Sequence, residues 1–125
     1  MEKSEQELKR LINILEQIKV GFLPQETQIH SIIAESLVNN GIEFQHEYRL
    51  SSDSRIDFLF GNIGIEVKKS TVKDKDLLKQ LKKYSESDKV SKIILVTTKS
   101  VNIPSFINNK QIYIVNLYRN WSISL

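Results

Sequence analysis

Residues 55–69 read RIDFLFGNIGIEVKK, and this stretch decides the predicted fold because it has the pattern of a β-hairpin. Apolar residues occupy every second position over 56–60 and again over 63–67, on either side of the dipeptide Gly61-Asn62. Period-two alternation is typical of a strand that buries one face, and a Gly-Asn pair between two such runs is a common hairpin loop. The buried face is expected to hold six side chains: Ile56, Phe58, Phe60, Ile63, Ile65 and Val67.

The register of this hairpin predicts which polar residues lie side by side. With the dipeptide as the loop, Phe58 pairs with Ile65, and Asp57 lies directly opposite Glu66. Opposite side chains on adjacent strands have Cβ atoms about 5 Å apart, and like charges at that distance repel. We therefore expect a cation between the two carboxylates, and a divalent metal is the natural candidate.

The composition is typical of one soluble globular domain that spans residues 1–125. Of these residues 40% are hydrophobic and 26% are charged, which is ordinary for such a domain. The absence of cysteine excludes disulfides, thiolate zinc sites and cysteine nucleophiles. No apolar run is long enough to span a bilayer, and the N-terminus lacks the apolar segment of a signal peptide. We therefore expect a cytoplasmic protein without membrane contacts.

Lysine is concentrated after the hairpin, although the net charge of the whole chain is only +3. Residues 66–92 contain nine Lys against five Asp or Glu. A local excess of this kind suits a phosphate-bearing partner. On charge alone, a solvated helix face is the alternative interpretation.

The remaining elements follow from the spacing of apolar residues. Spacings of three and four residues predict helices, whereas alternation or a short continuous apolar run predicts strands. The predicted order is α-α-β-β-β-α-β-(α)-β, which describes a mixed sheet with helices on its faces. The expected helices cover 3–19, 25–39 and 73–86, and the expected strands lie at 42–50, in the hairpin, at 92–98 and at 111–117, with a Pro104-containing loop or single helical turn before the last strand.

The pattern Asp57, eight intervening residues and then Glu66-Val67-Lys68 stands on adjacent predicted strands before a basic helix. In this element order it resembles the catalytic hairpin of the PD-(D/E)XK nuclease superfamily. That superfamily includes restriction endonucleases, Holliday-junction resolvases and recombination-associated exonucleases. Ile56 stands where the superfamily pattern has a proline, at a position that varies among its members.

The resemblance implies a restriction endonuclease-like fold of the α/β class, with a mixed central sheet flanked by helices. Its α-β-β-β-α-β core would cover residues 25–98, which follow that order element by element. An extra N-terminal helix within 1–20 would precede this core. A C-terminal loop, strand and tail, 99–125, would follow it.

The resemblance also implies a metal-dependent deoxyribonuclease that hydrolyses phosphodiester bonds by attack of an activated water. Asp57, Glu66 and the Val67 carbonyl would bind Mg²⁺ or Mn²⁺, cations that prefer oxygen ligands. Lys68, on the face of Glu66, would orient the attacking water and stabilise the developing charge. These residues, with a glutamate from the preceding helix, are the predicted catalytic set.

Glu26 is the glutamate that helix geometry favours for this role. At 100° per residue Glu26 falls within about 20° of the apolar stripe of its helix, whereas Glu35 lies on the opposite side. A negative charge also suits a helix start. His30 shares the face of Glu26, but a lone histidine is more often a packed or hydrogen-bonded residue, and Glu47 is a weaker candidate for a ligand or supporting group.

Gln80 and Tyr84 are four residues apart and therefore share a face of the third predicted helix. A Gln-x-x-x-Tyr pair after the E-x-K strand is similar to one in the exonuclease-like branch of the superfamily, where it helps to position nucleic acid. A core-capping tyrosine with a solvated glutamine is the alternative. Five lysines are candidate phosphate contacts on this side: Lys69, Lys73, Lys79, Lys82 and Lys83.

A nuclease-like module that binds nucleic acid or protein without cutting is the alternative function. The predicted acidic pair and lysine argue against it, because an inert site does not need adjacent carboxylates. DNA is the expected partner, and nothing in the sequence distinguishes it from RNA or fixes the substrate form. The first helix has apolar residues at heptad-like spacing, which suits either a homodimer or ordinary core packing.

Overall fold

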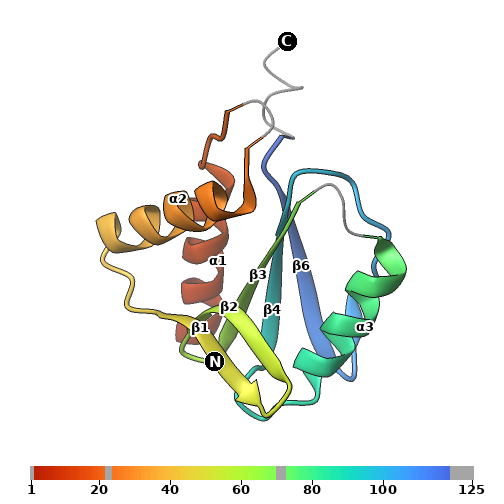
Figure 1. Ribbon diagram of the computed structural model, residues 1–125. Coiled ribbons are helices and arrows are strands. Elements are labelled where there is room, and N and C mark those ends of the chain that lie inside the picture. The colour runs from red at the N-terminus through yellow and green to blue at the C-terminus, as the bar shows by residue number, and fades with distance from the viewer. Residues whose placement is uncertain (1, 22–23, 70–72, 119–125) are drawn as a thin grey trace.

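The computed structural model describes residues 2–21, 24–69 and 73–118, which form an α/β arrangement with helices on both faces of a mixed sheet (Figure 1). Helices α1 (Glu2–Glu16) and α2 (Glu26–Asn39) cover one face, and α3 (Asp74–Ser85) covers the other. Six strands pair in the order β1-β2-β3-β4-β6-β5. They are β1 (Gln45–Ser51), β2 (Ser54–Phe60), β3 (Ile63–Lys68), β4 (Lys92–Thr97), β5 (Phe106–Ile107) and β6 (Lys110–Asn116).

The order α-β-β-β-α-β predicted for the middle of the chain is confirmed over residues 26–97. The hairpin strands β2 and β3 are antiparallel, and β3, β4 and β6 are parallel to one another. Strand β5 was not predicted from the sequence, because two residues are too few to show a period. Strand β5 pairs with β6 through a turn in which Asn108 and Asn109 have φ of 51° and 65°.

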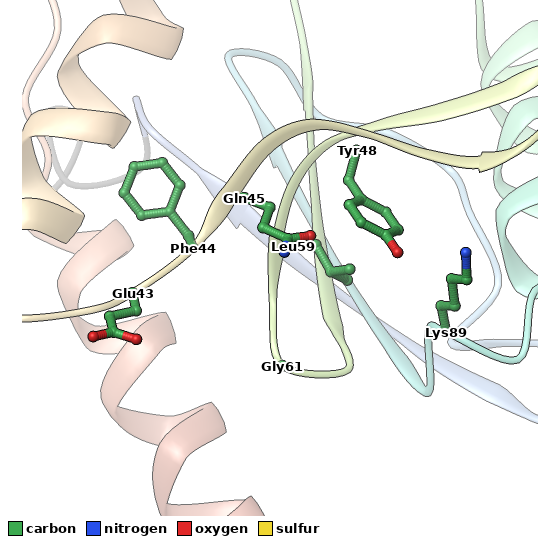
Figure 2. Close-up of a pocket in the computed structure, with 7 residues that line it drawn as sticks. All are labelled: Glu43, Phe44, Gln45, Tyr48, Leu59, Gly61 and Lys89. Carbon is green, nitrogen blue, oxygen red and sulfur yellow. The ribbon is translucent and has the colours of Figure 1, made fainter.

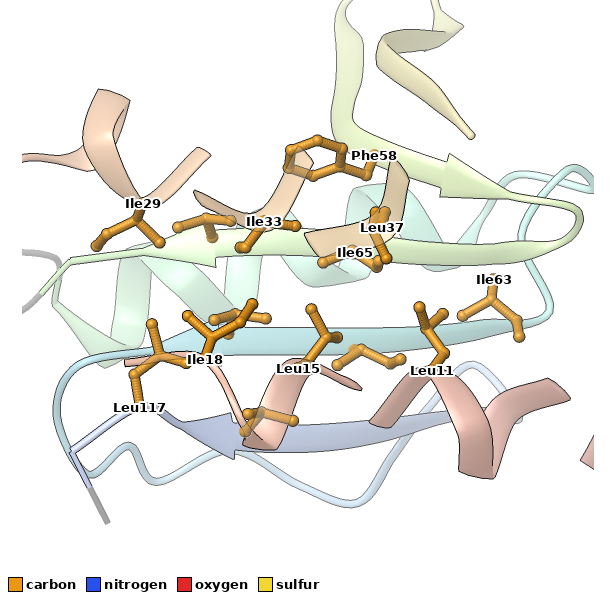
Figure 3. Close-up of a cluster of buried hydrophobic side chains, with 14 of the residues drawn as sticks. Leu11, Leu15, Ile18, Ile29, Ile33, Leu37, Phe58, Ile63, Ile65 and Leu117 are labelled. Atoms are coloured by element: carbon orange, nitrogen blue, oxygen red, sulfur yellow. The ribbon is translucent and has the colours of Figure 1, made fainter. Parts of the chain in front are cut away.

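The first core lies between the sheet and helices α1 and α2 (Figure 3). Three- and four-residue spacing aims one stripe of each helix at the sheet, and full burial of one such side chain stabilises the fold by about 1.5–3 kcal/mol. On the sheet side, Phe58, Ile65 and Val67 are fully buried against these helices. The helical stripes consist of Leu8, Leu11 and Leu15 in α1 and Ile29, Ile33 and Leu37 in α2.

The second core lies between the sheet and α3, where Leu77 and Leu81 are fully buried. Strand β4 contributes to both cores: Ile93 and Leu95 face α3, and the alternate residues face α1 and α2. This confirms the prediction that the apolar run of β4 is a buried strand. Over the described parts of the chain, no helix is both long and apolar enough to cross a membrane.

The β1–β2 ribbon turns over at Glu47, which means that the face directed at α2 before this residue is directed at α3 after it. The φ of Glu47 is 53°, in the left-handed region. Before this point in β1, His46 stacks on Phe58, a side chain of the first core. After it, Tyr48 packs against the second core, as does its cross-strand partner Ile56. The prediction that Ile56 shares the buried face of Phe58 is therefore wrong, because the alternation is broken between them.

Gly64 of β3 gives Ile56 the space to pack on the α3 side. A Cβ atom at Gly64 would overlap Cδ1 of Ile56, which is fully buried. Overpacking of this kind costs about 1–3 kcal/mol, so we expect Gly64→Ala to lower the free energy of unfolding by that amount in urea denaturation. The matched control is Gly21→Ala, where the added Cβ would meet nothing within 4 Å; equal effects of the two substitutions would contradict the expectation.

Candidate functional site

Asp57 and Glu66 come from adjacent strands at the point where the ribbon turns over. The predicted register is confirmed for Phe58 with Ile65, but beyond this pair the strands are joined through side chains. The backbone N–H of Asp57 donates to Oε1 of Glu66 at 3.2 Å, and that of Val67 donates to Oδ2 of Asp57 at 2.8 Å. Each carboxylate thus accepts a bond from the opposite strand, so the two are neighbours as predicted.

The two carboxylates are nevertheless held from opposite layers of the fold. Asp57 lies against His30 of α2, with 3.4 Å between Oδ2 and Nε2. Glu66 lies against Tyr84 of α3, whose hydroxyl donates to Oε2 at 2.9 Å. The prediction that Asp57 and Glu66 share one face of the hairpin is therefore wrong. The ribbon turns over at this point, so Asp57 is directed at α2 and Glu66 at α3.

Glu66 is almost completely buried, with 1% of its surface exposed. Burial, and then the negative charge of Asp57, raise the pKa of Glu66 to about 7. Lys68 opposes this shift, with Nζ 3.2 Å from Oε2 of Glu66. A buried carboxyl group beside a second carboxylate and a lysine is typical of sites that bind a cation or transfer a proton.

Tyr84 is a buried residue that holds Glu66 in place. Its hydroxyl contacts both Oε2 of Glu66 and, at 3.0 Å, the carbonyl oxygen of Arg55. Burial and the charge of Glu66 raise the pKa of Tyr84 above its usual range, and Gln80, one turn earlier, acts in the opposite direction. Because only 2% of Tyr84 is exposed, this tyrosine fixes a carboxylate of the site, and a contact with nucleic acid stays a prediction for the half-buried Gln80.

His30 brings a nitrogen to the side of Asp57 that faces α2. Helix α2 begins at Glu26, just after Gln25, whose N–H donates to the side chain of Gln28. One turn later, His30 Nε2 lies 3.8 Å from Oε1 of Glu26 and 3.4 Å from Oδ2 of Asp57. On the other side of the ring, Nδ1 lies 3.4 Å from Nε2 of His46.

The approach of Asp57 raises the pKa of His30 above its usual range, although burial opposes the shift. The charges of Asp57, Glu26 and Glu66 act in the same upward direction. The contact with Asp57 is long and poorly aligned, so within the described residues Nε2 is a buried nitrogen without a hydrogen bond of normal geometry. A buried nitrogen of this kind beside two carboxylates fits a metal ligand.

Glu26, His30 and Asp57 form a possible metal-binding group, because one ligand atom from each lies within 4.8 Å of the other two. Two carboxylates and one imidazole suit a divalent cation, and the imidazole nitrogen favours Mn²⁺ or another transition metal over Mg²⁺. Glu26 lies beside Asp57, as helix geometry predicted, although its side chain is exposed rather than inward-facing; Glu35, which is also exposed, is not part of this group. Glu66 is adjacent to this group but is not part of it, and ligation by Glu66 and by the Val67 carbonyl stays a prediction.

An open pocket of about 590 Å³ gives access to this group between α2 and the β1–β2 ribbon. Glu26, His30 and Asp57 lie on its walls, and Glu47 and Arg55 line it from the ribbon. The pocket is therefore mostly acidic, and Arg55 is the one arginine or lysine among its lining residues. Its other lining residues are Thr27, Ser31, Ala34 and His46.

A second open pocket, of about 620 Å³, lies on the other side of the ribbon (Figure 2). Its wall includes Leu59, and the Tyr48 ring extends toward Lys89, whose Nζ lies 5.2 Å from the ring centroid. Glu43 is the single acidic residue among its lining residues. This pocket has no cluster of ligands, so it is the weaker candidate for a catalytic site.

The predicted phosphate-binding lysines are spread over more than one surface. Lys83 pairs with Asp53 at 2.8 Å, near the turn that joins β1 to β2. Lys82 is exposed but lies about 160° around α3 from Tyr84, since two residues advance a helix by about 200°. Lys73 and Lys79 are exposed and Lys69 is half-buried, and their role in binding stays a prediction.

His30 was not predicted to be a ligand, and Arg55 was not among the predicted site residues. The signal for His30 was present, since it is four residues from Glu26 on the same helix face. The signal for Arg55 was weaker, because the position of its side chain depends on where the ribbon turns over. No protein-family model, curated protein or solved structure matches this chain.

Proposed function

We propose that this protein is a metal-dependent nuclease that hydrolyses phosphodiester bonds of DNA. The observation that carries the proposal is the convergence of Glu26, His30 and Asp57 next to the buried Glu66 and its half-buried ion-pair partner Lys68. We further propose that the fold is restriction endonuclease-like. The observed order α-β-β-β-α-β, with the D-(x)₈-E-x-K pattern on β2 and β3, supports this.

The side chains of the site divide into two functional groups. Glu26, His30 and Asp57 would hold Mg²⁺ or Mn²⁺, which when bound would stabilise the extra negative charge of a pentavalent phosphorus. Lys68 and Glu66 lie side by side, so one can donate to and the other accept from the same water molecule. The pKa of Glu66, about 7, lets this carboxyl group take up or release a proton near neutral pH.

Cleavage of a panel of linear, nicked, branched and single-stranded DNA tests the proposal. We expect Mn²⁺-dependent cleavage of at least one substrate, abolished by a chelator, and reduced about 10²-fold or more in Lys68→Ala, which removes a donor from the developing charge. The matched control is Lys75→Ala, because Lys75 is exposed on α3. Wild-type cleavage by Glu66→Ala would contradict the assignment, whereas Mn²⁺ binding without cleavage of any substrate would favour a binding module.

A further inference from the structure

Arg49 and Arg55 lie directly opposite each other on β1 and β2. Their backbones pair in register, so their side chains project from the same face of the ribbon with Cβ atoms about 5 Å apart. Neither residue is among the nucleic-acid contacts predicted from the sequence. Both side chains are exposed.

The face that carries the two arginines is the one on the metal-site side of the ribbon. Successive residues of a strand point to opposite faces. Tyr48 and Ile56, the neighbours of Arg49 and Arg55, pack against the α3 core, and Figure 2 shows the Tyr48 ring on the side of Lys89. The arginines therefore point the other way, and Arg55 lines the same pocket as Asp57.

Two like charges in this position destabilise the ribbon unless an anion lies between them. Among the described residues, no carboxylate lies within ion-pair distance of either guanidinium, although Asp53 and Glu47 are close in sequence. One nitrogen of Arg49 donates to the carbonyl oxygen of Ser52 at 2.9 Å, which restrains the side chain and leaves its other N–H groups available. The pair is thus positioned to bind an anion that the protein itself does not supply.

We propose that Arg49 and Arg55 bind one backbone phosphate of the nucleic acid, next to the phosphate that is cut at the metal site. This inference rests on the proposed nuclease function and names the surface that would position its substrate. Guanidinium groups form paired hydrogen bonds with phosphate oxygens and keep their charge at any physiological pH. Arg55 precedes Asp57 by two residues, about 7 Å along a strand, so the anchored phosphate would lie close to the reacting one.

Binding of a labelled DNA duplex, measured by fluorescence anisotropy in a chelator at several salt concentrations, tests this inference without cleavage. We expect the Arg49→Ala/Arg55→Ala double variant to bind at least about 10-fold more weakly. The slope of log K against log salt should fall by about 0.9, because the two arginines share one phosphate and one neutralised phosphate accounts for about 0.9 on duplex DNA. Arg49→Lys/Arg55→Lys, which keeps the charge but loses the fork of donors, should retain the slope and recover part of the affinity.

The control is Lys9→Ala/Lys75→Ala, which removes two exposed charges from α1 and α3 and should change affinity less than about 3-fold. The urea midpoint of the double arginine variant should equal or exceed that of the wild type, because repulsion is removed. Unchanged affinity and slope in that variant would overturn the inference, as would equal loss in the lysine control. Arginine-dependent binding without Mn²⁺-dependent cleavage would support the phosphate contact and contradict the proposed catalysis, so the two failures are distinguishable.

Discussion

Replacement of Asp57 by asparagine is expected to reduce the rate of metal-dependent DNA cleavage by at least about 10³-fold. Asparagine has nearly the same shape, and its amide oxygen can still accept the N–H of Val67. The substitution removes the charge that lies beside both His30 and Glu66. We therefore expect the fold to be retained while the metal site loses a ligand of its preferred type.

The measurement combines initial rates in Mn²⁺ with calorimetric titration of the same ion. Asp57→Asn should weaken Mn²⁺ binding strongly and leave the circular dichroism spectrum unchanged. The matched control is Asp53→Asn, which changes an exposed aspartate that pairs with Lys83 away from the metal-binding group. Its cleavage rate should stay within about twofold of the wild type, and a loss as large as that of Asp57→Asn would show that the assay reports folding.

Replacement of Glu66 by glutamine should stabilise the metal-free protein at pH 8 by about 3 kcal/mol and abolish efficient cleavage. The pKa of Glu66 rises from the ordinary 4.5 to about 7 on folding, so the folded state binds the proton more tightly than the unfolded state. The stability that comes from this proton is fully present below pH 4.5 and is lost as the pH rises through 7. Each pKa unit corresponds to about 1.4 kcal/mol, and glutamine stays neutral throughout.

Urea denaturation between pH 4.5 and 8.5 in a chelator measures this effect. The difference in unfolding free energy between Glu66→Gln and wild type should increase with pH across that window. His30, whose pKa is also raised on folding, contributes with the same sign in both proteins. Asp57 is the main cause of that shift and Glu66 the last, so most of the His30 contribution cancels in the difference. Glu35→Gln, at an exposed position of α2, should give a flat difference, and a flat difference for Glu66→Gln would contradict the expected burial of its charge. If the chelator is replaced by saturating Mn²⁺, the difference in unfolding free energy between Glu66→Gln and wild type should become smaller, because a bound cation offsets the repulsion between Glu66 and Asp57.

The sequence was sufficient for the parts of the fold that depend on periodicity. Alternation around Gly61-Asn62 predicted the register of β2 and β3, and apolar spacing predicted the three helices. These predictions use only the spacing of residues that are near in sequence, so they do not depend on knowing the tertiary contacts. The position of Glu26 was predictable for the same reason, since helix geometry decides which side chains share a face.

The turn-over of the ribbon was not predictable from spacing. It depends on the left-handed backbone of Glu47 and on the contact between Ile56 and Gly64, which joins residues on different strands. Because the ribbon turns over, Asp57 lies against α2 and Glu66 lies against α3. The pairing of Arg49 with Arg55 was missed because it depends on the register between β1 and β2, which alternation within one strand does not determine.

The left-handed residue of β1 has a consequence for how this protein behaves at high concentration. Strand β1 is one edge of the sheet, and an edge presents backbone groups on which a strand of another molecule can pair. The left-handed conformation at Glu47 interrupts the row of free backbone N–H and C=O groups near the middle of β1. An irregularity of this kind also bends an edge strand, so another strand pairs with it less readily. The same distortion that opens the site toward α2 thus disfavours pairing of another molecule along the β1 edge of the sheet.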